Sequence, residues 1–251
     1  MATRHERSVS PPPALITGYY ADPAARLSHA RDLFNRTARL YDPVNRLFSL
    51  GSGAWYRRRS LRQAGLRPGF RVVDVAVGTG LLAHEVLALT GDRRAIIGID
   101  VSEAMLAVAQ KNLRIPLVQG AAEALPLADD IADFVTMGYA LRHVADLVAT
   151  FREARRVLRP KGTLLLLEIS TPRRWLTRIL ASGYIGSLVP LLSRLMTRDP
   201  RARALLRYHW ETIMSSAPPE TIMQAMHDSG FRDVECRTEL DLFRCYIGRK
   251  A

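Results

Sequence analysis

Residues 71–80 read Arg-Val-Val-Asp-Val-Ala-Val-Gly-Thr-Gly, an apolar, valine-rich segment that runs directly into a glycine turn. Apolar β-branched residues favour a strand, and the apolar pattern after Gly80 favours a helix through Leu89. A glycine-rich turn between a strand and a helix lets a ligand approach the backbone N–H groups at the helix N-terminus. The stretch therefore predicts the first strand of an α/β sheet, with a ligand site at the turn.

The same alternation of strand and helix continues toward the C-terminus. Further strands are predicted at 95–99, 116–119, 133–137 and 163–169, with helices between them. This repetition indicates an α/β fold with a doubly wound parallel sheet. Two last strands, at 233–237 and 242–248, are expected as a terminal antiparallel hairpin on the sheet edge. The fold expected is therefore a seven-stranded, Rossmann-like sheet with helical insertions.

The expected organisation has five parts. In chain order they are a disordered tail (1–14), an N-terminal helical lid (15–64), a cofactor-binding Rossmann-like core (65–171), basic amphipathic cap helices (172–215), and a last helix with the terminal hairpin (216–251). Within the lid, Pro43 predicts a helix break at Leu40-Tyr41-Asp42-Pro43, because proline disfavours helical backbone at the residue before it.

Composition narrows the functional classes. The 251 residues are 48% hydrophobic and 24% charged, which excludes a wholly disordered or collagen-like chain. The two cysteines are too few for a disulfide framework and lack the companions of a metal site, so no metal is expected. No apolar run is long enough to span a bilayer, and the N-terminus lacks the apolar segment of a secretory signal. A cytoplasmic protein is therefore expected.

The glycine loop alone leaves the cofactor open. Residues 78–83 also satisfy the dinucleotide pattern, and Asp100 lies near the expected ribose position, so a nicotinamide or flavin oxidoreductase is a rival. Three features favour a cofactor with a cationic amino-acid end. Asp74 puts an acid late in the first strand, the chain ends in a hairpin, and the turn at 120–126 can border an adenine.

These segments resemble the class I S-adenosylmethionine-dependent methyltransferases. The general resemblance rests on residues 74–80, Asp100, Met105, 122–126 and 156–162. A narrower resemblance, to the ubiquinone/menaquinone biosynthesis C-methyltransferases, rests on residues 33–45, 49–51, 138–144, 167–172 and 207–213. Together the similarity covers roughly residues 30–250.

The resemblance implies S-adenosylmethionine as the cofactor and assigns its contacts. Gly78, Thr79 and Gly80 would hold the methionine end, Asp100 the ribose hydroxyls, and Met105 the adenine. The remaining candidate cofactor residues are Asp74, Ala121, Ala122 and Gly138. The sequence departs from the family pattern in four places. The family usually has Asn at Ala121, Ser at Gly138 and Asn at His143, and it usually has a His near Gly53.

Carbon methylation of a phenol or hydroquinone requires a base, or a cation that stabilises the phenolate. Arg142 and His143 follow the fourth strand, at the edge where ligands of such sheets bind, and Tyr41 lies in the lid. These three are the candidate catalytic residues. The alternatives are an ion pair between Arg142 and Glu168, a helix cap by His143, and a simple turn at Tyr41.

Residues 173–210 carry eight arginines and one acid among many apolar side chains. Such a segment is typical of a helix on an anionic membrane, and it is equally compatible with a cap that closes the active site. Nucleic acid is not expected, despite the net charge of +12, because aromatic residues do not alternate with the basic ones.

The sequence thus predicts methylation of a ring carbon in a small quinol or phenol precursor, with or without a prenyl tail, as in isoprenoid quinone biosynthesis. The alternatives are an O- or N-methyltransferase of a secondary metabolite or phospholipid head group, and a non-catalytic cofactor-binding partner subunit. A homodimer and a peripheral position on the inner membrane face are further expectations.

Overall fold

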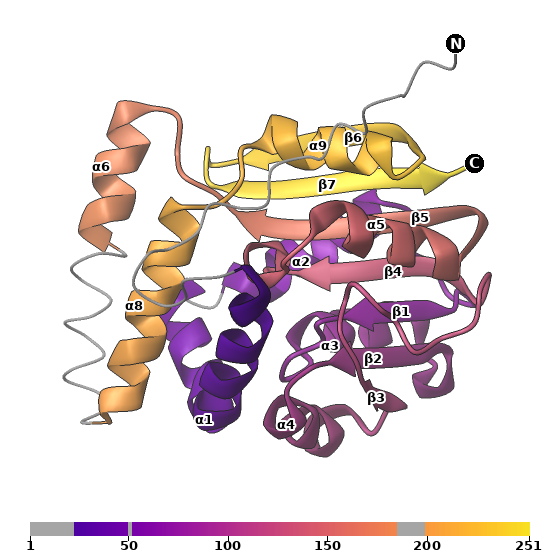
Figure 1. Ribbon diagram of the computed structural model, residues 1–251, viewed down its shortest axis with the longest axis horizontal. Coiled ribbons are helices and arrows are strands. Elements are labelled where there is room, and N and C mark those ends of the chain that lie inside the picture. The colour runs from indigo at the N-terminus through magenta and orange to yellow at the C-terminus, as the bar shows by residue number, and fades with distance from the viewer. Residues whose placement is uncertain (1–22, 50–51, 185–198) are drawn as a thin grey trace, which may run out of the picture.

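The computed structural model describes residues 23–49, 52–184 and 199–251 (Figure 1). The predicted tail at 1–14, the start of the predicted lid and the middle of the predicted cap segment lie outside the described residues.

One mixed sheet forms the centre of the molecule. Its seven strands among the described residues follow the order β3-β2-β1-β4-β5-β7-β6. Strands β1 to β5 run parallel, and β7 pairs antiparallel with both β5 and β6, so the predicted doubly wound sheet with a terminal hairpin is confirmed. The strands are β1 Val72–Val75, β2 Ile96–Asp100, β3 Leu117–Gln119, β4 Ala132–Gly138, β5 Leu158–Ile169, β6 Phe231–Glu239 and β7 Phe243–Lys250.

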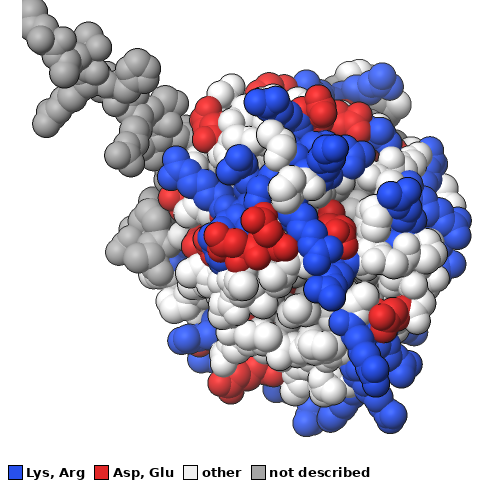
Figure 2. Space-filling model, turned by 90° about the vertical axis from the view of Figure 1, so that its right-hand side faces the viewer, with Lys and Arg blue, Asp and Glu red and all other residues white. Residues whose placement is uncertain are grey.

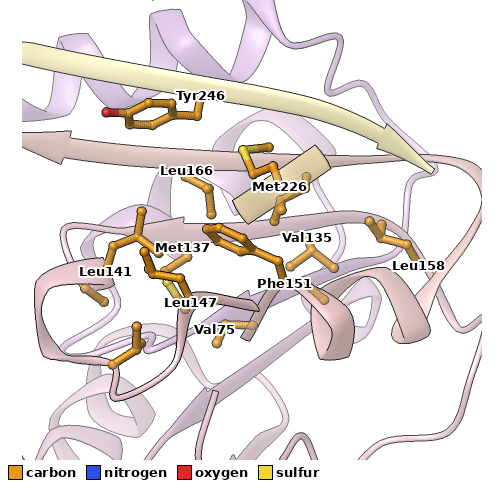
Figure 3. Packing of buried hydrophobic residues seen from close by; sticks show 14 of the residues in the cluster. Val75, Val135, Met137, Leu141, Leu147, Phe151, Leu158, Leu166, Met226 and Tyr246 are labelled. Atoms are coloured by element: carbon orange, nitrogen blue, oxygen red, sulfur yellow. The ribbon is translucent and has the colours of Figure 1, made fainter. Parts of the chain in front are cut away.

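Helices cover both faces of this sheet. Helices α5 (Leu147–Val157) and α9 (Pro219–Asp228) pack on one face, and α2 (Ser52–Gln63) and α3 (Leu81–Thr90) contribute to the core on the other. Figure 3 shows Phe151 beside Met226 in the buried cluster on this face. Strands β1 and β4 are largely buried on both faces because helices cover each face, as is usual for parallel strands. Helix α4 (Glu103–Leu113) begins after Ser102, whose hydroxyl accepts a hydrogen bond from the Met105 N–H as the helix cap.

The other helices gather at the carboxyl ends of the parallel strands (Figure 1). They are α1 (Pro23–Ser49), α8 (Pro200–Met214) and, farther out, α6 (Trp175–Gly183). A short 3-10 turn, η2 (Leu141–His143), follows β4 at the same edge. Ligands of open α/β sheets bind at this edge, so these helices enclose the place where a site is expected.

Helix α1 runs through Pro43 without ending, so the predicted break at 40–43 is wrong. A proline inside a helix costs roughly 3 kcal/mol, because one hydrogen bond is lost and the ring meets the preceding turn. Packing offsets this cost: Val44 is buried against Leu205 and Leu206 of α8, and Tyr41 packs beside them.

No helix of the described residues is long and apolar enough to cross a membrane. Basic side chains are scattered among acidic and uncharged ones on the face at the amino ends of the parallel strands (Figure 2). Several of them pair with acids, for example Arg159 with Asp133 and Lys250 with Asp130. The positive charge is therefore distributed over the surface and is not confined to the carboxyl edge.

Candidate active site

Two cavities meet at the carboxyl edge of the sheet. The strand-edge cavity, of about 670 Å³, lies beside Gly78, Asp100 and Gly138. The helical cavity, of about 880 Å³ with its open mouth, lies between α1, α2, α8 and the β6–β7 turn. A smaller junction cavity, of about 370 Å³, lies along the glycine loop. Tyr41 and Tyr139 line all three, so a ligand in one large cavity would approach a ligand in the other at these two rings.

Asp100 at the end of β2 organises the strand-edge cavity. Its Oδ2 accepts a hydrogen bond from the Gly78 N–H and its Oδ1 from the Ser102 N–H, both at 2.8 Å. Burial raises the pKa of Asp100, and these backbone donors oppose that shift. The carboxylate thus fixes the glycine loop and still lines the cavity, where its remaining lone pairs can accept hydroxyl donors.

The structure brings most of the predicted cofactor residues together. Those lining the strand-edge cavity are Gly78, Asp100, Met105, Ala122 and Gly138. Thr79 lines the junction cavity. Ala121 lines a shallow neighbouring hollow, which shares Leu27, Val101 and Gly120 with the strand-edge cavity.

Asp74 and Gly80 are not among the described residues that line these cavities. The Asp74 carboxyl is buried behind the loop, where Oδ1 accepts a hydrogen bond from the Thr136 hydroxyl at 2.6 Å. Burial raises the pKa of Asp74 to about 7. Gly80, with φ +93°, starts α3 in a conformation that favours glycine. Direct cofactor contact by these two residues stays a prediction.

Glu123 is a site residue that sequence reasoning missed. Its Oε1 accepts a hydrogen bond from the Ala145 N–H at 2.8 Å, and Oε2 is buried without a partner among the described residues. The side chain lines the strand-edge cavity, so Oε2 is an acceptor available to a ligand donor. Glu123 is the acid within the turn at 120–126 that the sequence predicted to border an adenine, and this position could have identified it as a site residue.

Helix α1 covers the strand-edge cavity and is tied to the loops around it. Asp42 Oδ1 accepts a hydrogen bond from the Thr79 hydroxyl at 2.5 Å, and Asn35 Oδ1 accepts one from the Ser102 hydroxyl at 2.7 Å. Phe34 lines the cavity from the same helix. The helix therefore closes the site by contacts with the two loops that would hold a nucleotide.

Arg142 lines the helical cavity and forms the ion pair that the sequence offered as the alternative to a catalytic role. Its Nη1 donates to Glu168 Oε2 at 2.9 Å, and both side chains are at least 95% buried. Glu168 Oε1 also accepts a hydrogen bond from the Leu141 N–H at 2.7 Å. Burial raises the pKa of Glu168, and the positive charge of Arg142 opposes that shift. The pair therefore holds a cation at the wall of the cavity.

His143 faces the strand-edge cavity, and it is not among the described residues that line the helical cavity. Its Nδ1 lies 2.9 Å from the Tyr208 hydroxyl, and the two rings stack at 5.3 Å. Burial, reinforced by Arg142, lowers the pKa of His143 well below its ordinary value. The alternative that His143 caps the next helix is wrong, because Asp146 is the cap of α5.

Tyr41 and Tyr139 form the wall where the cavities meet. Burial raises the pKa of both phenols, so both are neutral near pH 7. Tyr139 has φ +61°, a strained conformation for a residue with a side chain. Such strain is common at ligand sites, and the amino-acid sequence alone does not predict it at Tyr139.

His209 of α8 is a second residue that sequence analysis did not select. It lines the helical cavity, and its Nδ1 lies 2.8 Å from the Leu205 carbonyl oxygen. A carbonyl only accepts, so Nδ1 carries the proton and Nε2 keeps its lone pair. Burial, reinforced by the charge of Arg142, lowers the pKa of His209 to about 4.

The Rossmann-like sheet with an antiparallel end, the glycine loop after β1 and the acid at the end of β2 fit the class I S-adenosylmethionine-dependent methyltransferases, and the sequence comparisons show this class. The sequence model of the ubiE/COQ5 methyltransferase family matches residues 24–240, and the chain belongs to this family.

Relatives in that family are close in length to this chain. The ubiquinone/menaquinone biosynthesis C-methyltransferase UbiE of Shewanella frigidimarina is 36% identical over 211 residues, which cover 81% of this chain and 83% of the relative. The protein of the same name from Shewanella oneidensis is 34% identical over 210 residues, covering 81% and 82%.

Solved structures share the fold at lower identity. A methyltransferase from Aquifex aeolicus superposes with a TM-score of 0.59 at 16% identity, covering 83% of this chain and 98% of that chain. The phosphoethanolamine N-methyltransferase 2 of Haemonchus contortus, in complex with S-adenosyl-L-methionine, has a TM-score of 0.62 at 16% identity, covering 88% and 59%.

Proposed function

We propose that this chain methylates a ring carbon of a hydroquinone or phenol acceptor, using S-adenosylmethionine, in isoprenoid quinone biosynthesis. The names of its relatives in the ubiE/COQ5 family support the reaction class. The observation that carries the proposal is the meeting of the two large cavities at Tyr41 and Tyr139. An acceptor ring in the helical cavity would face a cofactor in the strand-edge cavity at that point.

The residues of the strand-edge cavity fit this cofactor. Glu123 Oε2 is a buried acceptor without a described partner, which suits the amino group of an adenine. Asp100 suits the ribose hydroxyls, and Met105 provides an apolar surface for the base. S-adenosylmethionine, when bound, supplies an electrophilic methyl group on a positively charged sulfur.

The loop residues would shape the methionine end of the site. Gly78 and Thr79 would approach the ligand with their backbone, while buried Asp74 and Gly80 keep the loop in its conformation. Gly138 also serves by its size, because a Cβ at this position would lie 3.1 Å from the Leu82 side chain. Ala121 would contribute only its backbone at the outer end.

The helical cavity contains the groups that activate a phenol. Arg142 is a fixed cation whose field favours a phenolate, and Tyr41 is placed to orient the ring beside the cofactor. His209 Nε2 is placed to accept the hydroxyl proton, because Nδ1 is occupied by the Leu205 carbonyl. His143 faces the proposed cofactor cavity and would serve as a positioning residue, because it contacts the Tyr208 hydroxyl and Tyr208 in turn packs on Phe34 of α1.

We expect His209→Gln to lower kcat about 100-fold while leaving cofactor affinity unchanged, because general bases typically contribute that much or more. In the wild type, activity should persist from neutral pH down to about 5 and fall toward pH 4, as the imidazole with a pKa of about 4 becomes protonated. The measurement is a pH profile of kcat. His227→Gln on the exposed end of α9 is the matched control. An unchanged kcat in His209→Gln would mean that a group other than His209 accepts the hydroxyl proton of the acceptor.

An apolar rim surrounds the mouth of the helical cavity. Trp55 and Leu240 line the cavity and are among the large hydrophobic side chains exposed in the described residues. The Arg174 N–H donates to Asp241 at 2.8 Å, so α6 begins beside Leu240. The other exposed large hydrophobic side chains all lie on α6: Trp175, Leu176, Ile179 and Leu180.

This arrangement supports an acceptor with a prenyl tail that leaves through the mouth toward an anionic bilayer. Arg173, Arg174 and Arg178 lie beside the apolar side chains of α6, as in helices that lie at a membrane surface. A peripheral position on the inner membrane face follows as part of the proposal. A cytoplasmic location and a homodimer remain predictions.

We expect the double variant Ile179→Asp/Leu180→Asp to bind anionic lipid vesicles at least about 10-fold more weakly than the wild type, because each apolar side chain loses roughly 1.5–3 kcal/mol of burial. Co-sedimentation with phosphatidylglycerol vesicles measures the effect. Ala88→Asp, at an exposed position of α3 on the body, is the matched control. Failure of the wild type to sediment would refute the membrane proposal and leave the methyl transfer untouched.

The reaction itself is tested by release of S-adenosylhomocysteine with a panel of acceptors. A prenylated hydroquinone should stimulate release, whereas a catechol and phosphoethanolamine should not. Stimulation by the catechol or the amine alone would replace carbon methylation with O- or N-methylation. Cofactor binding without release on any acceptor would favour the non-catalytic partner subunit.

A further inference from the structure

Arg57 of α2 is a buried cation in the wall between the helical cavity and the junction cavity. Its residue is 7% exposed, and it lines both the helical cavity and the junction cavity. Its Nε is buried and has no hydrogen-bond partner in the part of the chain that the structure describes. An unpaired buried charge is costly, so a cation held this way is suited to an anionic ligand.

The two arginines that follow Arg57 on the same helix each lie beside an acidic side chain. Arg58 Nε donates to Glu85 at 2.7 Å, and Arg59 lies 3.5 Å from Glu239 and over the Trp55 ring. Arg57 instead points into the protein, where its charge acts on Asp74 and Tyr139 beside the glycine loop.

Gly53 makes room for this guanidinium. A Cβ at position 53 would lie 3.1 Å from Arg57 Nη1, which is tighter than most real contacts. A side chain at position 53 would therefore press on the guanidinium and require it to shift by a few tenths of an ångström. The small residue one turn before Arg57 keeps its head group free at the cavity wall.

We propose that Arg57 binds the carboxylate of the methionine end of S-adenosylmethionine. The junction cavity brings Arg57 together with Gly78 and Thr79, the loop residues assigned to that end of the cofactor. The planar guanidinium matches a carboxylate with two parallel hydrogen bonds, a geometry that lysine does not provide. The inference rests on the proposed function, because it concerns the same cofactor.

The test compares S-adenosylmethionine with its decarboxylated analogue, which keeps the sulfonium and the amine, by calorimetric titration. The wild type should bind S-adenosylmethionine about 10- to 100-fold more tightly than the analogue, the range typical of a charged hydrogen-bonded contact. Arg57→Gln should lose this preference while keeping its affinity for the analogue. Arg57→Lys should recover only part of the preference. Arg62→Gln, on the exposed face of α2, should match the wild type.

The outcomes separate this inference from the proposed function. If the wild type binds neither ligand, both the proposed function and the role of Arg57 are wrong. If the wild type binds S-adenosylmethionine and Arg57→Gln keeps the full preference, only the role of Arg57 is wrong. In that case an effect confined to the KM of the acceptor would assign the guanidinium to an anionic acceptor. Retained affinity for the analogue shows that Arg57→Gln is folded.

Discussion

Glu168→Ala is expected to lower the free energy of unfolding by about 3–5 kcal/mol, because it leaves a buried charge without its partner. Glu168 lies in β5, and its two carboxylate oxygens accept from Arg142 Nη1 and from the Leu141 N–H. The Arg142 Nε already lacks a partner among the described residues, so no second described acceptor compensates at that atom. The loss should also release η2, which carries Arg142 to the cavity wall.

Urea unfolding followed by circular dichroism measures this difference. Glu168→Gln keeps an acceptor for the Leu141 N–H and should cost less than the alanine variant. Glu235→Ala is the matched control, since its pair with Arg237 is exposed and should contribute under about 1 kcal/mol. Equal stability of Glu168→Ala and the wild type would show that the Arg142 charge is neutralised in some other way.

Asp100→Ala is expected to weaken cofactor binding at least about 100-fold, because a carboxylate that accepts several hydrogen bonds contributes roughly 1.5–3 kcal/mol with each. The variant removes the proposed ribose contact and also the two 2.8 Å bonds that fix Gly78 and Ser102. Both losses act on the same ligand, because the glycine loop and the ribose site adjoin each other in the strand-edge cavity.

The dissociation constants of S-adenosylhomocysteine for the wild type and for Asp100→Ala, measured by equilibrium binding, give the loss of affinity. Asp92→Ala, which removes an exposed cap at the start of the turn before β2, is the control for loss of a carboxylate outside the site. Thermal unfolding should remain cooperative in Asp100→Ala. An affinity within threefold of the wild type would mean that the ribose is bound elsewhere.

The parts of the fold that sequence analysis predicted are those specified by local pattern. Valine-rich β1 and the glycine turn that follows it were predicted from residue type, and the structure shows that Gly78 and Gly80 of this turn have positive φ. The terminal hairpin was predicted from similarly local signals. The continuous helix through Pro43 could not be predicted, because its stability depends on α8, which lies more than 150 residues away in the sequence.

The candidate site shows the same division. Asp100, Met105 and Gly138 were predicted from motifs, and the structure gathers them around one cavity. Arg57 and His209 were not selected from the sequence, because only the fold shows that their side chains are buried at a cavity wall. An arginine among neighbouring arginines gives no sign that it alone is buried. The tautomer of His209 is fixed by a carbonyl one helical turn away, which only the folded helix places.

The most direct test of carbon methylation is the position of the transferred methyl group. The purified protein would be incubated with S-adenosylmethionine carrying a ¹³C-labelled methyl and a prenylated hydroquinone, and the product analysed by carbon NMR. We expect the label on a ring carbon, with one S-adenosylhomocysteine formed for each methyl transferred. Label on a ring oxygen, or no transfer by protein that binds the cofactor, would contradict the proposed function.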